Sequence, residues 1–164
     1  MDISETTALW FLPVAAPIAI WAAFSDLKTM KIPNNAVIAL VLAFAVVGLF
    51  ALPLADYAWR YVHLIVVLGI GIALNMAGAI GAGDAKFAAA MAPFIALGDI
   101  MVFLIVFAVV LIAAFVTHRV FSQIPQVRLA TQDWESWGNK DFPMGLALGG
   151  ALIAYLVLGA MGGI

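Results

Sequence analysis

The chain has 164 residues, of which 66% are hydrophobic and only 10% are charged. A soluble domain is about half apolar and about a quarter charged, so this composition indicates an integral membrane protein with no room for a separate soluble domain. The net charge is −2 and no basic tract occurs, which gives no support to nucleic-acid binding. Cysteine is absent, which excludes disulfides and thiolate metal sites.

Six apolar runs indicate membrane-crossing helices, because about 20 apolar residues span a bilayer core of about 30 Å. The runs cover residues 8–24, 36–52, 61–79, 85–97, 100–116 and 144–164. We therefore predict an all-α integral membrane protein with about six transmembrane helices in one membrane-embedded domain, residues 1–164. No basic segment precedes the first run, so we expect it to be a retained span and not a cleaved signal.

The distribution of basic residues predicts the orientation of these spans. The loops after the first, third and fifth runs hold six of the seven Lys and Arg residues, and loops rich in Lys and Arg face the cytoplasm. Both termini are then expected outside. Asp26 follows the first run and Asp84 precedes the fourth, so both acids are predicted to lie at the cytoplasmic face.

The fourth run, residues 85–97, is short for a membrane span, at about 20 Å with about 1.5 Å per residue. The Gly-Ala-Gly-Asp turn in front of it, residues 81–84, is therefore expected to be drawn below the membrane surface. Irregular backbone at that depth is tolerated only against protein or a water-filled cavity. The sequence thus predicts a wet cavity, open to the cytoplasm, with Asp84 at its rim.

Two aspartates that face one water molecule can hydrolyse a peptide bond without a metal or a cofactor. One carboxylate takes a proton from water while the other, protonated, polarises the scissile carbonyl. A carboxylate in or near hydrocarbon costs at least about 2.5 kcal/mol, so Asp26 and Asp84 are functional candidates. The residues alone leave two alternatives open. The acids could form a proton relay in a small proton-coupled transporter or channel, or Lys28 and Lys86 could neutralise them in a non-catalytic scaffold.

Helix dipoles predict which aspartate holds the proton. Asp26 lies near the C-terminus of the first predicted helix, where an anion is disfavoured. Asp84 lies near the N-terminus of the fourth, where an anion is favoured. On this argument Asp26 carries the shared proton and Asp84 activates the water.

Three short motifs resemble those of the type IV prepilin peptidases. Gly81-Ala82-Gly83-Asp84, followed by Lys86, resembles the GxGD-K signature of that family. Asp26, a few residues ahead of Ile32-Pro33-Asn34, resembles the family's first motif. Residues 142–149 (FPMGLALG) resemble the motif of its last span, with Met144 where the family often has Tyr. The three matches occur in the order that the family shows.

This resemblance implies an aspartic endopeptidase that removes the short basic leader from prepilin-like proteins at the cytoplasmic side of the inner membrane. It implies that Asp26 and Asp84 are the catalytic pair. The remaining motif residues receive no chemical role from it, and they are Gly81, Gly83, Lys86, Pro33, Asn34, Pro143 and Gly145. Larger relatives carry a Cys-x-x-Cys region linked to N-methylation, so methyltransferase activity is not expected here. The chain looks like the compact form of tight-adherence pilus systems or the archaeal preflagellin peptidases.

The expected partner is a small membrane protein with a basic leader in front of a hydrophobic helix. A basic leader suits an acidic docking surface, for which the candidates are Asp133, Glu135 and Asp141. These acids lie on the one long polar loop, residues 118–143, which could rest at the membrane interface or form a mobile connector. The sequence predicts neither the oligomeric state nor the identity of the prepilin.

Overall fold

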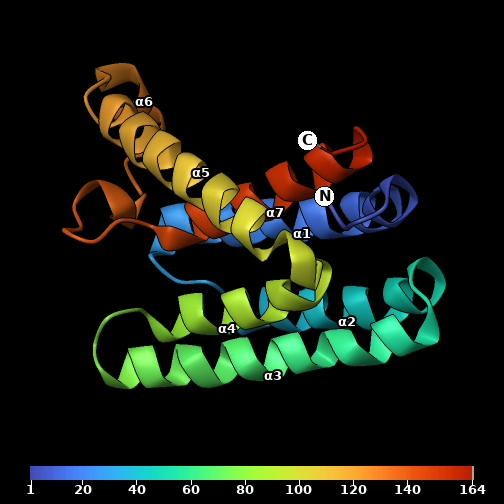
Figure 1. Ribbon diagram of the computed structural model, residues 1–164. Coiled ribbons are helices and arrows are strands. Elements are labelled where there is room, and N and C mark those ends of the chain that lie inside the picture. The colour runs from blue at the N-terminus through green and yellow to red at the C-terminus, as the bar shows by residue number, and fades with distance from the viewer. Residues whose placement is uncertain (164) are drawn as a thin grey trace.

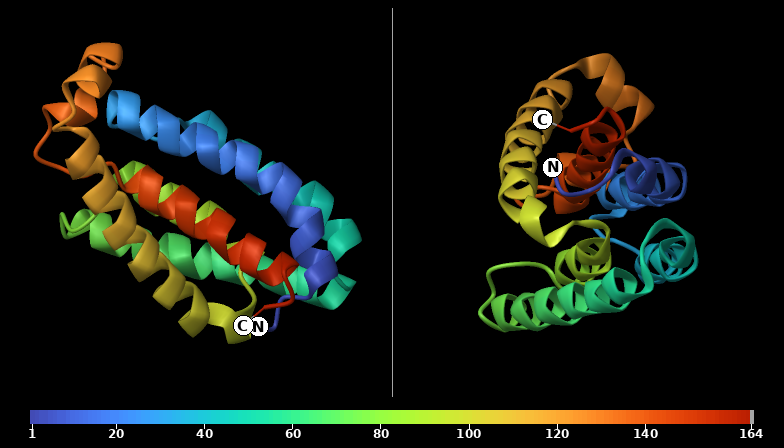
Figure 2. Two further views of the ribbon diagram at one scale, coloured as in Figure 1. Left: turned by 90° about the horizontal axis from the view of Figure 1, so that it is seen from above. Right: turned by 45° about the vertical axis from the view of Figure 1, so that its right-hand side comes forward.

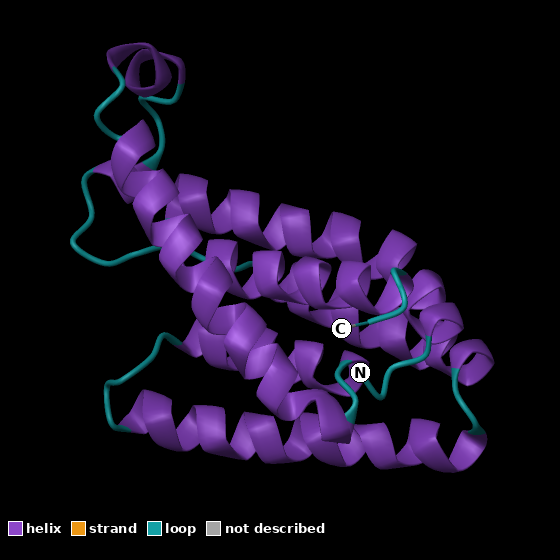
Figure 3. Cartoon of the chain, turned by 45° about the horizontal axis from the view of Figure 1, so that its top comes forward, coloured by secondary structure: helices purple, strands orange, loops and turns teal. Residues whose placement is uncertain are grey.

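The computed structural model describes residues 1–163, and within that range it contains helices and loops but no strand (Figure 3). The α-helices are α1 (Glu5–Thr29), α2 (Asn34–Ala51), α3 (Leu54–Met76), α4 (Ala82–Met91), α5 (Ile100–Phe121), α6 (Pro125–Ala130) and α7 (Met144–Ala160). Three short 3-10 turns join them, η1 (Ala92–Phe94), η2 (Leu97–Asp99) and η3 (Glu135–Trp137). The predicted all-α fold is confirmed.

Four helical segments are long and apolar enough to cross a membrane, namely α1, α2, α3 and the continuous stretch Leu97–Phe121 that contains α5. They correspond to the first, second, third and fifth predicted spans. The other two predicted spans are α4, with 10 residues, and α7, with 17 residues, and both are shorter than the roughly 20 residues of a standard span. The structure therefore supports a multi-pass membrane protein, while a total of six crossings stays a prediction.

The helices form two layers, with α1, α7 and α5 in one and α2, α4 and α3 in the other (Figure 1). Small residues bring α1 and α7 close together, since a Cβ on Gly149 would lie 2.7 Å from the Ala19 carbonyl oxygen. Between the layers, the rings of Phe11, Phe44 and Phe94 form a buried cluster, with the Phe11 and Phe94 centroids 4.9 Å apart. This cluster fixes the position of α4 relative to α1 and α2.

The predicted fourth span is broken. α4 begins at Ala82, which places Asp84 in its first turn, and it ends at Met91 because Pro93 cannot continue the helix. The irregular backbone that follows is paired with protein, as buried positions in a membrane require. The buried Arg60 donates to the Pro93 carbonyl at 3.0 Å, and the Ala96 N–H donates to the Tyr155 hydroxyl at 3.1 Å.

The first and last described residues, Met1 and Gly163, lie side by side (Figure 2), at the end of the bundle opposite the C-terminus of α1. Asp99, which is 1% exposed, anchors this end. Its carboxylate accepts the backbone N–H groups of Asp2 and Ile3 and the Tyr155 hydroxyl. The termini thus share one end of the molecule, as an even number of spans predicts, and the side of the membrane that this end faces stays a prediction.

Candidate active site

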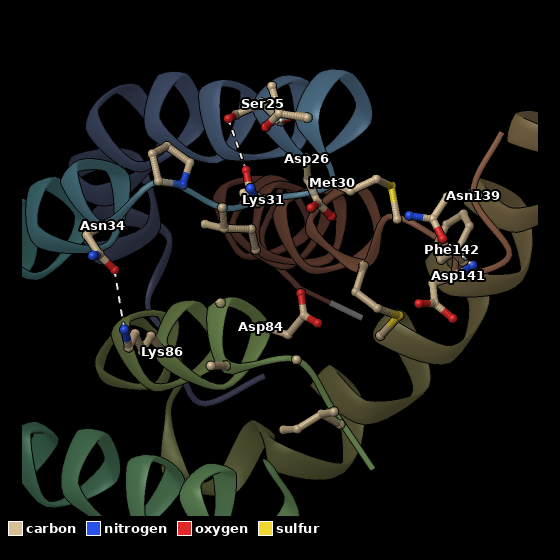
Figure 4. Close-up of a pocket in the computed structure, with 18 of the residues that line it drawn as sticks. Ser25, Asp26, Met30, Lys31, Asn34, Asp84, Lys86, Asn139, Asp141 and Phe142 are labelled. Atoms are coloured by element: carbon tan, nitrogen blue, oxygen red, sulfur yellow. Dashed lines mark hydrogen bonds between the residues drawn. The ribbon is translucent and has the colours of Figure 1, made fainter. Parts of the chain in front are cut away.

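A cavity of ≈ 1050 Å³ opens at the end of the bundle where α1 finishes and where α4 and α7 begin. Its walls come from three loops that are distant in sequence, within residues 25–34, 78–86 and 139–144. All three predicted motifs thus contribute to one pocket (Figure 4). The predicted cavity beside Asp84 is present, and its opening to the cytoplasm stays a prediction.

Asp26 occupies the last turn of α1 and is 5% exposed. The helix ends at Thr29, and the next residue, Met30, adopts the left-handed conformation with φ 51°, so the chain turns away and leaves the carboxyl group facing the cavity. The Gly145 N–H donates a hydrogen bond of 2.7 Å to Asp26 Oδ2. Gly145 is the second residue of α7, so Asp26 also lies at the N-terminus of that helix.

Asp84 lies in the first turn of α4, half-buried, outside the four helices that are long enough to cross a membrane. Its carboxyl group folds back toward Gly81, where a Cβ would lie 2.7 Å from Asp84 Oδ2. Burial raises the pKa of Asp84 to about 6, the negative charge of Asp26 adds to the rise, and a backbone hydrogen bond from Gly81 opposes it. The two carboxyl groups therefore interact electrostatically across the cavity.

The two lysines closest in sequence to these acids have other partners. Lys86 Nζ donates to the Asn34 side-chain oxygen at 3.4 Å (Figure 4). Lys28 Nζ forms an ion pair of 2.9 Å with Asp133. Across residues 1–163, neither Asp26 nor Asp84 forms an ion pair. The interpretation in which Lys28 and Lys86 neutralise the two acids is therefore wrong.

The remaining motif residues shape the ends of helices. Pro33 and Pro143 occupy the N-cap positions of α2 and α7, neither with a side-chain cap. A Cβ on Gly83 would lie 3.6 Å from Ile32, an ordinary contact, so the available space does not require glycine there. Gly81 and Gly145 are the motif glycines whose missing side chains make room for the aspartates.

The three acids predicted to dock a basic leader are placed differently from one another. Asp141 lines the cavity, together with Asn139 and Phe142, which we did not predict as lining residues. Asp133 is held by Lys28, which keeps the pKa of that carboxyl below its usual range. Neither Asp133 nor Glu135 lines the cavity. Of the predicted docking acids, the structure brings Asp141 alone to the candidate site.

The long polar loop is folded onto the helix ends. Trp134 contacts Phe24 of α1 edge-on, with ring centroids 5.3 Å apart, and stacks on Trp137 at 5.7 Å. Trp137 in turn stacks on His118 of α5 at 4.8 Å. Phe142 contacts the same His118, edge-on at 5.9 Å. The loop thus packs against the ends of α1 and α5, and its last residues, Asn139, Asp141 and Phe142, line the cavity. The interfacial segment and the mobile connector both stay predictions.

The helix-dipole prediction, which puts the shared proton on Asp26, stays a prediction, and its treatment of Asp26 is incomplete. It considered only α1, whose C-terminus disfavours an anion, whereas the carboxylate also accepts an N–H at the start of α7. No sequence signal pairs these positions, which are 119 residues apart. The Gly-containing motif at residues 142–149 was the available sign that this segment belongs to the site.

Chemically, the arrangement provides two electrostatically coupled carboxyl groups in one open cavity at the end of a helical bundle. Within residues 1–163, no group of three or more His, Cys, Asp or Glu side chains is arranged to hold a metal ion. Two carboxyl groups that interact in this way titrate over different pH ranges, so one can act as a base while the other acts as an acid.

Comparison with known proteins gives a family. A family model described as the type IV leader peptidase family matches residues 13–117, well over half of the chain. The matched region contains Asp26 and Asp84 and ends before the segment that leads into α7. Searches of curated proteins and of solved structures found no significant match. The chain therefore belongs to the type IV leader peptidase family.

Proposed function

We propose that this protein is an aspartic endopeptidase that removes the short basic leader from prepilin-like proteins at the cytoplasmic face of the inner membrane. One observation carries the proposal. Asp26 and Asp84, from opposite layers of the bundle, place their carboxyl groups in one cavity without a lysine to neutralise either. Membership of a leader peptidase family supports the same chemistry.

The reaction requires one ionised and one protonated carboxyl group. The ionised group takes a proton from water as the water oxygen bonds to the scissile carbonyl carbon, and the protonated group gives its proton to the carbonyl oxygen. The resulting tetrahedral diol then collapses. The C–N bond breaks, the first carboxyl returns its proton to the leaving nitrogen, and the second recovers a proton from a diol hydroxyl. Both carboxyl groups end in their starting states.

The place of the cavity supports a cut beside a membrane helix. Asp26 and Asp84 lie where α1 ends and α4 begins, and not halfway along the bundle. A substrate helix that lies beside the bundle would therefore present its end, with the leader attached, to the two carboxyl groups. The position of Asp141 on the cavity wall supports an attraction between its carboxylate and a basic leader residue.

A proton-coupled transporter or channel would use the same aspartates but needs a path across the whole bundle. Fully buried aromatic side chains, Phe11, Phe44, Phe94 and Tyr155, fill the space toward the opposite end. This packing supports a cavity that opens at one end, which suits a peptidase better than a channel.

The test is to incubate the purified protein in detergent with a small membrane protein that carries a basic leader, and to determine the new N-terminus by mass spectrometry. We expect one defined cut between the leader and the hydrophobic helix, and no cut in a matched substrate whose leader has been deleted. Proton flux into proteoliposomes without cleavage would instead establish the transporter. The absence of both cleavage and proton flux would contradict the peptidase and the transporter alike.

A further inference from the structure

The Asp26 carboxylate accepts a hydrogen bond from a helix other than its own. Gly145 contributes one of the N–H groups at the start of α7 that lack a partner within the helix, and this N–H lies 2.7 Å from Asp26 Oδ2. Both residues are buried. A short hydrogen bond to an ionised acceptor is about twice as strong as one between neutral groups, so the bond favours the ionised carboxylate.

Residue 145 must be glycine for this contact to form. A Cβ at Gly145 would lie 2.9 Å from Asp26 Cβ and 3.1 Å from Asp26 Oδ2, so one of the two residues would have to move. Gly149, one turn further along α7, is packed against the Ala19 carbonyl of α1. This second contact fixes α7 along α1, so the N–H of Gly145 is held in place by the packing of the two helices.

The ionised form of Asp84 is less stabilised by hydrogen bonds than the ionised form of Asp26. Its partial exposure by itself favours the charge, but its compensating contact is made with Gly81 in its own helical turn, and within residues 1–163 it accepts no N–H from a second helix as Asp26 does. The charge on Asp26 is itself one of the reasons that the pKa of Asp84 reaches about 6. As pH falls, Asp84 is therefore the group that takes up the shared proton, while Asp26 keeps its N–H partner.

We propose that Gly145 is a positioning residue whose backbone N–H keeps Asp26 as the ionised member of the pair and leaves the proton to Asp84. The catalytic meaning of this assignment rests on the proposed function. Asp26 then takes the proton from water, with Oδ2 bonded to Gly145 and Oδ1 available to the water. Asp84 donates its proton to the scissile carbonyl oxygen. These roles are the reverse of those that the dipole argument predicted.

Carboxyl-specific infrared difference spectra of the purified protein test the assignment without any substrate. At about pH 5, below the Asp84 pKa of about 6, the band of a protonated carboxyl group should be present in the wild type. It should vanish in Asp84→Asn and persist in Asp26→Asn. A band that vanishes in Asp26→Asn and persists in Asp84→Asn would overturn the assignment.

Gly145→Ala tests the positioning role itself. The added Cβ should separate Asp26 from the α7 N–H, so a second protonated-carboxyl band should appear at about pH 5, and a further Asp26→Asn change should remove it. Gly150→Ala is the matched control, since its Cβ would meet only the Val110 side chain, at 3.0 Å, and no second band is expected. A folded Gly145→Ala protein with the wild-type spectrum would contradict the positioning role.

The two proposals fail separately. If the spectra assign the proton to Asp84 but the wild-type protein cleaves no leader, the proposed function is wrong and the positioning role stands. If the leader is cut but the protonated-carboxyl band belongs to Asp26, the proposed peptidase function is supported and the positioning role of Gly145 is wrong. Should Gly145→Ala not fold, the two aspartate variants still decide which group holds the proton.

Discussion

The Lys86 ammonium group lies 3.4 Å from the side-chain oxygen of Asn34, so the N-terminal half of α4 is tied to the first turn of α2. This contact joins the motif around Asp84 to the motif that follows Asp26. Lys86 therefore acts on the position of α4 and on the electrostatic potential of the cavity, without a direct bond to either aspartate.

Lys86→Ala and Asn34→Ala should each lower kcat/KM by about two- to tenfold, the effect of losing one hydrogen bond of ordinary strength. Because both changes remove the same contact, the double variant should be little worse than either single variant. Steady-state kinetics on the four proteins of this cycle measure the coupling. Additive losses would show that the two residues act independently.

Gly81→Ala should reduce activity far more than Gly83→Ala. A Cβ at residue 81 would stand 2.7 Å from Asp84 Oδ2 and displace the carboxyl group, and a misplacement of about 1 Å can cost about a hundredfold in rate. A Cβ at residue 83 would meet Ile32 at 3.6 Å, and alanine within a helix is favoured over glycine by about 0.5–1 kcal/mol. Equal losses in the two variants would contradict the geometry of this turn.

The pH dependence of kcat/KM should report the titration of the aspartate pair. With Asp84 required in its protonated form, activity should fall as pH rises above about 6, by about tenfold per unit well above that value. The apparent pKa of this limb belongs to the pair, so the profile is compared with the infrared assignment. A rate that stays constant from about pH 5 to about pH 8 would exclude a titrating acid near 6.

The folding stability of the protein should also depend on the titration of Asp84. The folded-state pKa of Asp84 lies above the ordinary value of 3.8 for an aspartate, so the folded protein binds the proton more tightly, and its stability falls as pH rises from about 4 to about 6. Asp84→Asn removes this loss. Its melting temperature should therefore exceed that of the wild type at about pH 8 and approach it at about pH 4. A variant that is destabilised at every pH would point to a structural role for Asp84.

Asp141→Asn should weaken binding of a basic leader, whereas Asp133→Asn should not. Asp141 lines the cavity, while Asp133 lies outside it and is already paired with Lys28. We expect KM for a basic-leader substrate to rise for Asp141→Asn at low salt, with the difference shrinking as salt is added. Identical KM values for both variants at low salt would remove Asp141 from the docking surface.

Composition and apolar runs were sufficient to predict the membrane helices. A segment in hydrocarbon must form its backbone hydrogen bonds within a helix, and its apolar run must be long enough to cross the bilayer. Asp26 and Asp84 could also be identified, since a rare acid at the end of an apolar run has few structural reasons to be there. The predicted fourth span, residues 85–97, is too long because it passes through Pro93, a residue that favours the end of a helix.

The partners of the site residues could not be predicted. Lys28 is close to Asp26 in sequence but pairs with Asp133, on a loop that folds back through the contact of Trp134 with Phe24. The bond from Gly145 to Asp26 likewise depends on how α7 packs along α1. Such contacts follow from the packing of distant helices, on which local sequence patterns carry no information.

The most direct test of the catalytic pair is leader cleavage by Asp26→Asn and Asp84→Asn, each compared with the wild type and with Gly150→Ala under the same conditions. We expect each aspartate variant to lose about a hundred- to ten-thousandfold in kcat while its helical content stays close to that of the wild type. Cleavage at a near-normal rate by either folded variant would show that Asp26 and Asp84 do not form the catalytic pair.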